Sequence, residues 1–129
     1  MKLRSFWLRS ERMEQFEIVI EEIKEYSPQL LEKVRQLTEQ LDNNFQELKE
    51  DDLREMITAE GTHLFVARLT DSQEVIGMTT LIVYRIPYKM KGWIEDVVVD
   101  KDYRKHGIGT KLLEFSIEKA REKGVKSLN

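Results

Sequence analysis

Residues 93–110 read WIEDVVVDKDYRKHGIGT, and this segment carries the strongest structural signal in the chain. Residues 93–100 predict a strand, and three successive valines within it suggest burial on both faces. A turn with two glycines follows the strand. A helix is then predicted from about Gly109 to Lys123, with Gly124 as its C-cap. The local order is therefore strand, glycine-containing turn and helix.

The turn between this strand and this helix has the properties of a phosphate site. Gly107 and Gly109 let the backbone approach a ligand closely and adopt positive φ where needed. The free N–H groups at the start of the helix lie at the positive end of its dipole, where anions bind. Two basic side chains and a hydroxyl add to this capacity. The candidate residues are Arg104, Lys105, His106, Gly107, Ile108, Gly109 and Thr110.

Other phosphate-binding motifs fit this turn less well. A P-loop ends in Gly-Lys-Ser/Thr, whereas this sequence has Thr110 before Lys111. A dinucleotide fingerprint has a third glycine, which would fall at Leu112, and needs more residues downstream than the sequence provides. From spacing alone, an ordinary strand–turn–helix connection remains the alternative.

The rest of the chain predicts one α/β domain. Residues 1–12 show no periodicity and are interpreted as a leader or extension, or as an extra edge strand, so the domain spans residues 13–129. Apolar residues at Leu112, Leu113, Ile117 and Ala120 predict the buried stripe of the last helix. The other predicted elements are a strand around 16–20, helices over 28–41 and about 51–60, hairpin strands over 63–69 and 75–84, a surface loop over 86–92 and a strand from 125.

The composition excludes several classes of protein. Hydrophobic residues make up 40% and charged residues 35%, as in a soluble globular protein, and no apolar run is long enough to span a membrane. With a net charge of −3 the chain lacks the basic footprint of a nucleic-acid binder. The absence of cysteine excludes disulfides, cysteine-ligated zinc and a thiol nucleophile. We expect a cytoplasmic protein without a metal.

The motif of the glycine turn resembles the signature of a known family. The six residues from Arg104 to Gly109 match the pattern Arg/Gln-x-x-Gly-x-Gly/Ala of the GNAT superfamily of acyl-CoA N-acyltransferases. The preceding strand and Tyr103 also fit, and the order of elements is similar over about residues 13–129. The resemblance implies an α/β (α+β) fold with a mixed, mostly antiparallel sheet flanked by helices.

The same resemblance implies an activity. We expect an N-acetyltransferase that transfers an acetyl group from acetyl-CoA to a primary amine by direct attack in a ternary complex. In such enzymes the signature backbone holds the pyrophosphate, and the preceding strand offers main-chain partners to the pantetheine, here by resemblance Val97, Val98 and Val99. The alternative is a coenzyme A-binding module without turnover.

Two carboxylates on the predicted strand are the candidate catalytic groups. Transfer to an amine needs a deprotonated amine and a stabilised oxyanion. Glu95 and Asp96 are neighbours, so a regular strand would place them on opposite faces and only one could reach a given cleft. In relatives, an acidic residue at this point often contacts the amine. We favour Glu95 as base or amine anchor, followed by Asp96, with a salt bridge or a solvated strand end as the alternative.

The resemblance stops before the family's pattern is complete. Members usually continue with another helix, which commonly carries a tyrosine that protonates the departing thiolate, and two more strands. The sequence therefore predicts either a C-terminally truncated enzyme with impaired catalysis, or a homodimer that pairs the strand Val125–Leu128 with a second copy. The acceptor is not identified: acidic residues at Glu47, Glu50, Asp51 and Asp52 would suit a cationic amine, or form a solvated charge run.

Overall fold

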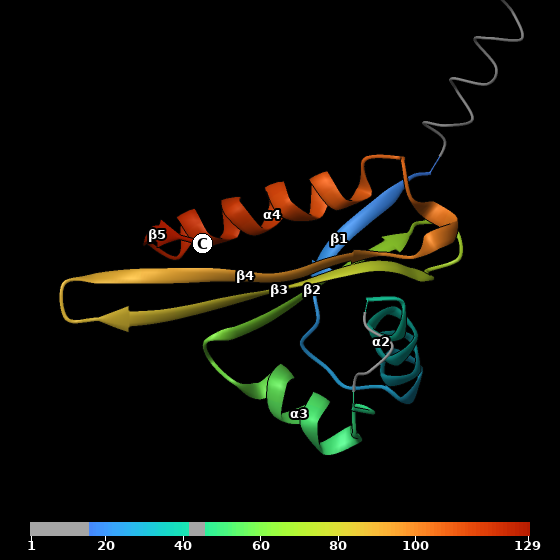
Figure 1. Ribbon diagram of the computed structural model, residues 1–129, viewed down its shortest axis with the longest axis horizontal. Coiled ribbons are helices and arrows are strands. Elements are labelled where there is room, and N and C mark those ends of the chain that lie inside the picture. Colours follow the sequence, from blue (N-terminus) through green and yellow to red (C-terminus); the bar gives the residue numbers. More distant parts are fainter. Residues whose placement is uncertain (1–15, 42–45) are drawn as a thin grey trace, which may run out of the picture.

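A five-stranded sheet forms the centre of the protein, with the strands in the order β1-β2-β3-β4-β5 (Figure 1). The structure is a computed structural model that describes residues 16–41 and 46–129. The predicted leader and the helix break at 42–44 lie outside these residues. The elements are β1 (Ile18–Glu22), α2 (Pro28–Leu41), α3 (Glu50–Thr58), β2 (Thr62–Leu69), β3 (Val75–Ile86), β4 (Lys89–Val99), η1 (Lys101–Tyr103), α4 (Ile108–Glu122) and β5 (Val125–Leu128).

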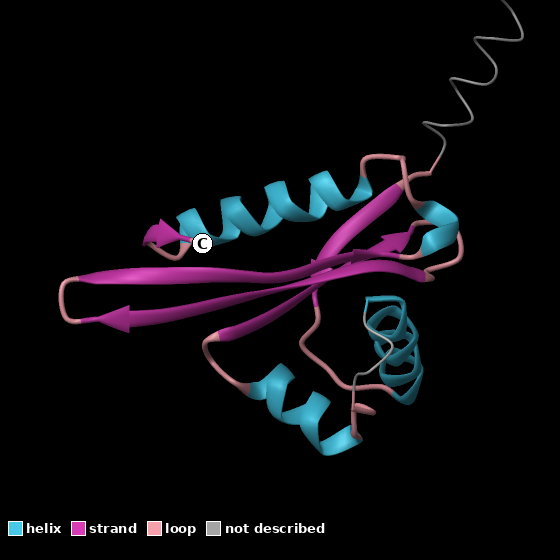
Figure 2. Cartoon of the chain, viewed as in Figure 1, coloured by secondary structure: helices cyan, strands magenta, loops and turns pink. Residues whose placement is uncertain are grey.

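The sheet is mixed and mostly antiparallel, as predicted. Strands β1 to β4 pair as antiparallel neighbours, and only β5 is parallel, beside β4. Helix α4 covers one face, and helices α2 and α3 cover the other (Figure 2). Each face therefore has its own core: Leu37, Leu53 and Val66 are fully buried on the α2–α3 side, and Leu81 and Leu112 are fully buried on the α4 side.

Helix α2 forms where local signals predict it. Ser27 caps its start, because the Leu30 N–H donates to the Ser27 hydroxyl at 3.1 Å, and Pro28 is the first helical residue. Its apolar positions are three or four residues apart, which places them on one face. The buried residues of this face are Leu30, Leu31, Val34 and Leu37. The predicted helix boundaries are confirmed.

The predicted surface loop over residues 86–92 is wrong, because β4 already begins at Lys89. Strand β3 continues to Ile86, and a tight turn at residues 87–88 returns the chain, with Ile86 opposite Lys89 and Arg85 opposite Met90. The resulting β3–β4 hairpin reaches beyond the body of the sheet (Figure 1). On its other side β4 is paired by β5, where the Asn129 N–H donates to the Gly92 carbonyl at 3.0 Å.

Helix α4 buries a different stripe from the predicted one. Its buried residues recur every four positions and are Ile108, Leu112, Ser116 and Ala120. Leu113 and Ile117, which were predicted to be buried, are 40% and 36% exposed. Of the three valines expected to be buried on both faces, Val97 is 38% exposed. The exposed residues thus belong to one side of α4 and to β4, which is relevant to the site below.

Candidate functional site

The glycine turn (residues 104–109) leads from β4 and η1 into α4. Gly107 has φ 77° and Lys105 has φ 71°, so the backbone is left-handed at both positions. The Lys111 N–H makes a helical bond to the Gly107 carbonyl at 3.1 Å. The N–H groups of residues 108–110 precede that bond and have no helical acceptor. No described side chain caps this end of the helix, so its N–H groups can bind an anion.

The two glycines of the turn have different roles. A Cβ at Gly107 would meet nothing within 4 Å, so this glycine is required by its positive φ and not by crowding. A Cβ at Gly109 would lie 3.6 Å from both Val97 and Val99, which is ordinary van der Waals contact. A small side chain would therefore fit at position 109, where the first turn of α4 lies beside β4. The turn is open towards solvent at Gly107.

The outer edge of β4 carries main-chain groups that β3 does not use. The Asp100 N–H donates to the Ile76 carbonyl at 2.8 Å, and Val98 lies opposite Met78 in the same ladder. Main-chain N–H and C=O groups alternate in direction from residue to residue along a strand. Those of Val98 therefore point towards β3, and those of Val97 and Val99 point away from it. The Val99 carbonyl accepts a hydrogen bond from Arg104 Nε at 3.0 Å. Of the three valines predicted to offer main-chain partners, Val97 and Val99 have the suitable orientation.

Strand β5 does not cover this outer edge. Its pairing register ends at Gly92 opposite Leu128, and one more bond joins the Ile94 N–H to the Asn129 carbonyl at 2.8 Å. Beyond Ile94, β3 is the only described strand that pairs with β4. The edge from residue 97 to 99 therefore runs beside α4 with the main-chain groups of Val97 and Val99 turned outward.

An apolar side of α4 borders this edge. Gly109, Leu113 and Ile117 are four residues apart and share one side of the helix. A Cβ at Gly109 would lie 3.6 Å from Val97 across the gap to the strand, and Val97, Leu113 and Ile117 are all more than a third exposed. Apolar side chains along an open main-chain edge suit an extended ligand that has both amide and alkyl groups.

A β-bulge interrupts β4 at its middle. Glu95 lies opposite Thr80, but the next register pair is Val98 with Met78, so Asp96 and Val97 together oppose Thr79. Asp96 has φ 47°, and the buried Thr79 hydroxyl donates to the Glu95 carbonyl at 3.0 Å. The bulge therefore has a side-chain hydrogen bond from the neighbouring strand.

The bulge changes the faces that the two candidate carboxylates occupy. Thr80 and Asp96 both line a cavity on the α2–α3 side of the sheet. Glu95 lies directly opposite Thr80, and opposed residues share a face. Both carboxylates are therefore on the α2–α3 side, and the expectation of opposite faces from regular alternation is wrong.

This cavity, called the α2–α3 cavity below, has a volume of about 380 Å³. It is bounded by the sheet, by α2 and by the segment that leads into α3. Its lining residues are Val34, Thr38, Leu41, Gln46, Glu47, Leu48, Asp52, Met56, Leu64, Met78, Thr80 and Asp96. Since Asp96 belongs to both the cavity and the bulge, the cavity opens where the outer edge of β4 ends.

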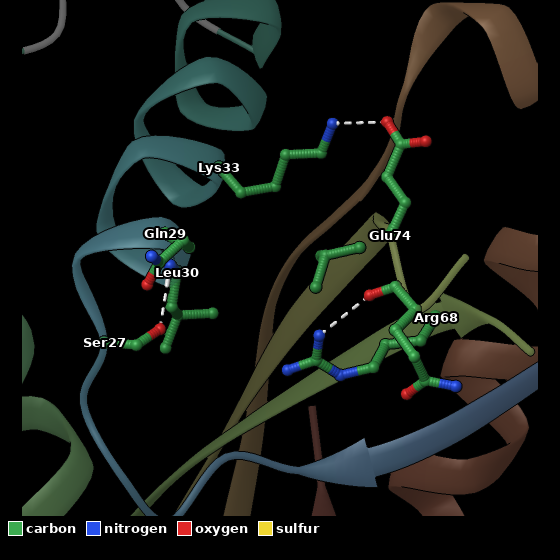
Figure 3. A pocket seen from close by; sticks show the side chains of 8 residues that line it. Ser27, Gln29, Leu30, Lys33, Arg68 and Glu74 are labelled. Atoms are coloured by element: carbon green, nitrogen blue, oxygen red, sulfur yellow. Dashed lines mark hydrogen bonds and ion pairs between the residues drawn. The ribbon is translucent and has the colours of Figure 1, made fainter.

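A smaller cavity of about 220 Å³ lies between the start of α2 and the β2–β3 turn (Figure 3). Its charged side chains already have partners. Lys33 Nζ lies 2.8 Å from Glu74 Oε1, and Arg68 Nη1 donates to the Gln73 carbonyl at 3.0 Å. The first bond joins α2 to the β2–β3 turn and the second joins β2 to it, so the cavity is better explained by packing than by ligand binding.

Aromatic side chains support the glycine turn from the β1 side. The Phe16 ring meets Tyr103 at 5.1 Å and His106 at 4.8 Å between centroids, both edge to face. Burial, followed by the charges of Glu74 and Asp100, raises the pKa of Tyr103 above its usual value of 10.0. The ring contact shows that the His106 side chain packs against Phe16, while the His106 main chain belongs to the glycine turn.

Metal-binding clusters and membrane-spanning helices are both absent from the described residues. Among residues 16–41 and 46–129, no three His, Asp or Glu side chains gather where they could hold a metal ion. Over the same ranges, no helix has the length and apolar character needed to cross a membrane.

The fold and the glycine turn define a class of protein, and comparison with known families gives the same result. The family model described as the acetyltransferase (GNAT) family matches residues 20–129. The chain belongs to this family, as the sequence motif predicts. A search of curated proteins finds no match.

Solved structures share the fold. An aminoglycoside acetyltransferase from an uncultured soil metagenomic sample, in complex with sisomicin, is similar with a TM-score of 0.76 and 25% identity, over 87% of this chain and 75% of that one. An acetyltransferase of Trypanosoma brucei has a TM-score of 0.72 and 21% identity, over 88% and 81%. Glucosamine-6-phosphate N-acetyltransferase from Arabidopsis thaliana has a TM-score of 0.70 and 18% identity, over 88% and 80%.

Two parts of the site are missing from the sequence prediction. Thr79 supports the bulge, but the adjacent threonines of β3 carry no local signal of that role. Leu113 and Ile117 border the outer edge of β4, although periodicity assigns them to the core. Their four-residue spacing from Gly109 could have revealed a second apolar side of α4.

Proposed function

We propose that this protein transfers an acetyl group from acetyl-CoA to a primary amine, by direct attack within a ternary complex. One observation carries the proposal: the glycine turn and the bulge at Asp96 stand at the two ends of the outer edge of β4, and Asp96 also lines the α2–α3 cavity. A donor lying along this path would have its phosphates at the turn and its thioester near the bulge. The acceptor would enter from the cavity.

The residues along the path fit the parts of coenzyme A. The free N–H groups at the start of α4, with Lys105 beside them, suit the pyrophosphate. The outward main chain of Val97 and Val99 suits the amides of the pantetheine, although the Val99 carbonyl already accepts a bond from Arg104. The exposed side chains of Leu113 and Ile117 suit its alkyl portions. Acetyl-CoA would supply an activated acyl group.

The reaction requires an amine held near the bulge. The nitrogen lone pair forms a C–N bond to the acyl carbon while the C–S bond breaks, and the proton lost by the amine balances the proton gained by the thiolate. Asp96 lines the cavity, and Glu95 lies on the same face. Either carboxylate can bind the ammonium form and accept its proton. Comparing Asp96→Asn with Glu95→Gln identifies which one does so, since only the loss of the anchor should lower turnover strongly.

Ligand-induced stabilisation tests binding separately from turnover. Acetyl-CoA at ~100 times its Kd should add ~2.7 kcal/mol to the free energy of unfolding, a rise of several degrees in Tm. Lys105→Gln should reduce this rise. Lys123→Gln removes the same charge at the other end of α4 and should not reduce it. If acetyl-CoA leaves the Tm unchanged, the proposal is wrong.

Thiol release over a panel of primary amines then tests turnover. Release that depends on the amine supports the transferase. A rise in Tm with no release from any amine would instead support a coenzyme A-binding module without turnover.

A further inference from the structure

The α2–α3 cavity has carboxylates on two sides. Asp96 lies on the sheet side, and Glu47 and Asp52 lie across the cavity, before and within the first turn of α3. Glu50 and Asp51 are on the same helix but do not line the cavity. Glu50, Asp51 and Asp52 are all exposed to solvent, and of the three Asp52 lines the cavity.

Among the described residues, a positively charged side chain lies near only one of these carboxylates. Arg35 Nη1 lies 3.6 Å from Glu47, while Arg35 Nε donates to the Leu48 carbonyl at 2.7 Å. Asp52 accepts a weak hydrogen bond from the main-chain N–H of Lys49 at 3.4 Å, and this donor carries no charge. Within the described part of the chain, neither Asp52 nor Asp96 forms an ion pair, and no Lys or Arg lines the cavity.

The surface that separates the carboxylates is apolar. Leu64 and Met78 from the sheet are buried, and Met56 of α3 packs against the same core cluster. An acceptor that spans the cavity would place a hydrocarbon segment over these side chains. The cavity thus has carboxylates on its sheet side and on its α3 side, and apolar side chains among the residues that line it.

We propose that the acceptor is an aliphatic diamine or longer polyamine. One amine reacts beside Asp96, and a second, charged amine binds Asp52, with Glu47 nearby. The hydrocarbon chain lies over Leu64 and Met78. This inference rests on the proposed transferase function and adds the substrate class.

Three amines with the same five-carbon chain test the inference. Cadaverine ends in a second ammonium, pentylamine in a methyl group and δ-aminovalerate in a carboxylate. Thiol release should give the highest kcat/KM for cadaverine, by at least ~5-fold over pentylamine, which is about 1 kcal/mol. The difference should lie in KM, and δ-aminovalerate should be the poorest acceptor. High salt should reduce the preference for cadaverine.

Two matched variants locate the effect. Asp52→Asn should lower the ratio of kcat/KM for cadaverine over pentylamine, whereas Asp51→Asn removes the same charge from the same helical turn and should keep that ratio. Equal kcat/KM for all three amines would overturn the diamine inference and leave the transferase in place. Equal losses in the two variants would show a long-range charge effect and overturn the role of Asp52. No release with any amine would refute both proposals.

Discussion

Replacing Thr79 with valine should disturb the bulge that places Asp96 at the cavity. Valine keeps the shape of threonine but lacks the hydroxyl that donates to the Glu95 carbonyl at 3.0 Å. The matched change is Thr79→Ser, which keeps the hydroxyl and removes one buried methyl group. The two variants therefore separate a hydrogen bond from packing at a single position that is 1% exposed.

The two changes should cost about the same stability. A hydrogen bond contributes ~1 kcal/mol net, and a buried methylene-sized group contributes about 0.8 kcal/mol. For a chain of 129 residues, either loss lowers the Tm by roughly 4 °C. Left-handed backbone costs about 1–2 kcal/mol at a non-glycine residue, and somewhat less at aspartate. The hydrogen bond from Thr79 is thus comparable in size to the strain at Asp96, so losing it should loosen the bulge.

Two measurements follow from this balance. Hydrogen–deuterium exchange of the peptide that contains residues 95–97 should accelerate in Thr79→Val and stay close to wild type in Thr79→Ser. The kcat for thiol release should fall at least ~5-fold in Thr79→Val and stay close to wild type in Thr79→Ser. Thr79 does not contact substrate, so the fall would come from the displacement of Asp96. Equal exchange and equal kcat in the two variants would refute this positioning role.

Three further substitutions test the packing. Gly61→Ala should destabilise the protein by ~1–3 kcal/mol in urea unfolding, since its Cβ would lie 2.6 Å from the Val83 carbonyl oxygen; an unchanged midpoint would contradict this close approach. Gly107→Ala should cost about 1–2 kcal/mol through its φ of 77° alone, and Gly107→Asn should cost less; equal midpoints would argue against strain as the cause. Leu112→Ala should cost ~2–5 kcal/mol, because Leu112 is fully buried between α4 and the sheet; a loss below ~1 kcal/mol would mean that α4 packs loosely.

The features that the sequence predicts well are those set by nearby residues. Helix α2 begins at Pro28 because Ser27 caps it, and α4 begins at Ile108 because Gly107 can adopt positive φ. Both signals lie within a few residues of the structure that they determine. The sequence predicts the glycine turn for the same reason, and the family model confirms the family that its motif resembles.

The features that the sequence does not predict depend on distant pairing. Residues 89–92 read as a loop because they follow Pro87 and contain two lysines, yet β3 and β5 pair with them on either side. The bulge depends on the register of β4 against β3, which no local pattern specifies. For that reason Glu95 and Asp96 were expected on opposite faces. Self-association through β5 stays a prediction.

Backbone strain follows the proposed path. Among the described residues, positive φ at a non-glycine position occurs at Gln73, Asp96 and Lys105. Gln73 belongs to the β2–β3 turn, where its N–H donates to the Leu69 carbonyl at 2.8 Å, so a local hydrogen bond accounts for its conformation. The other two stand at opposite ends of the outer edge of β4, one at the bulge and one in the glycine turn. A regular strand and a glycine at position 105 would avoid this cost of roughly 1–2 kcal/mol per residue. The Thr79 hydrogen bond offsets part of this cost at Asp96, and positive φ at both ends of one open edge agrees with a binding role for that edge.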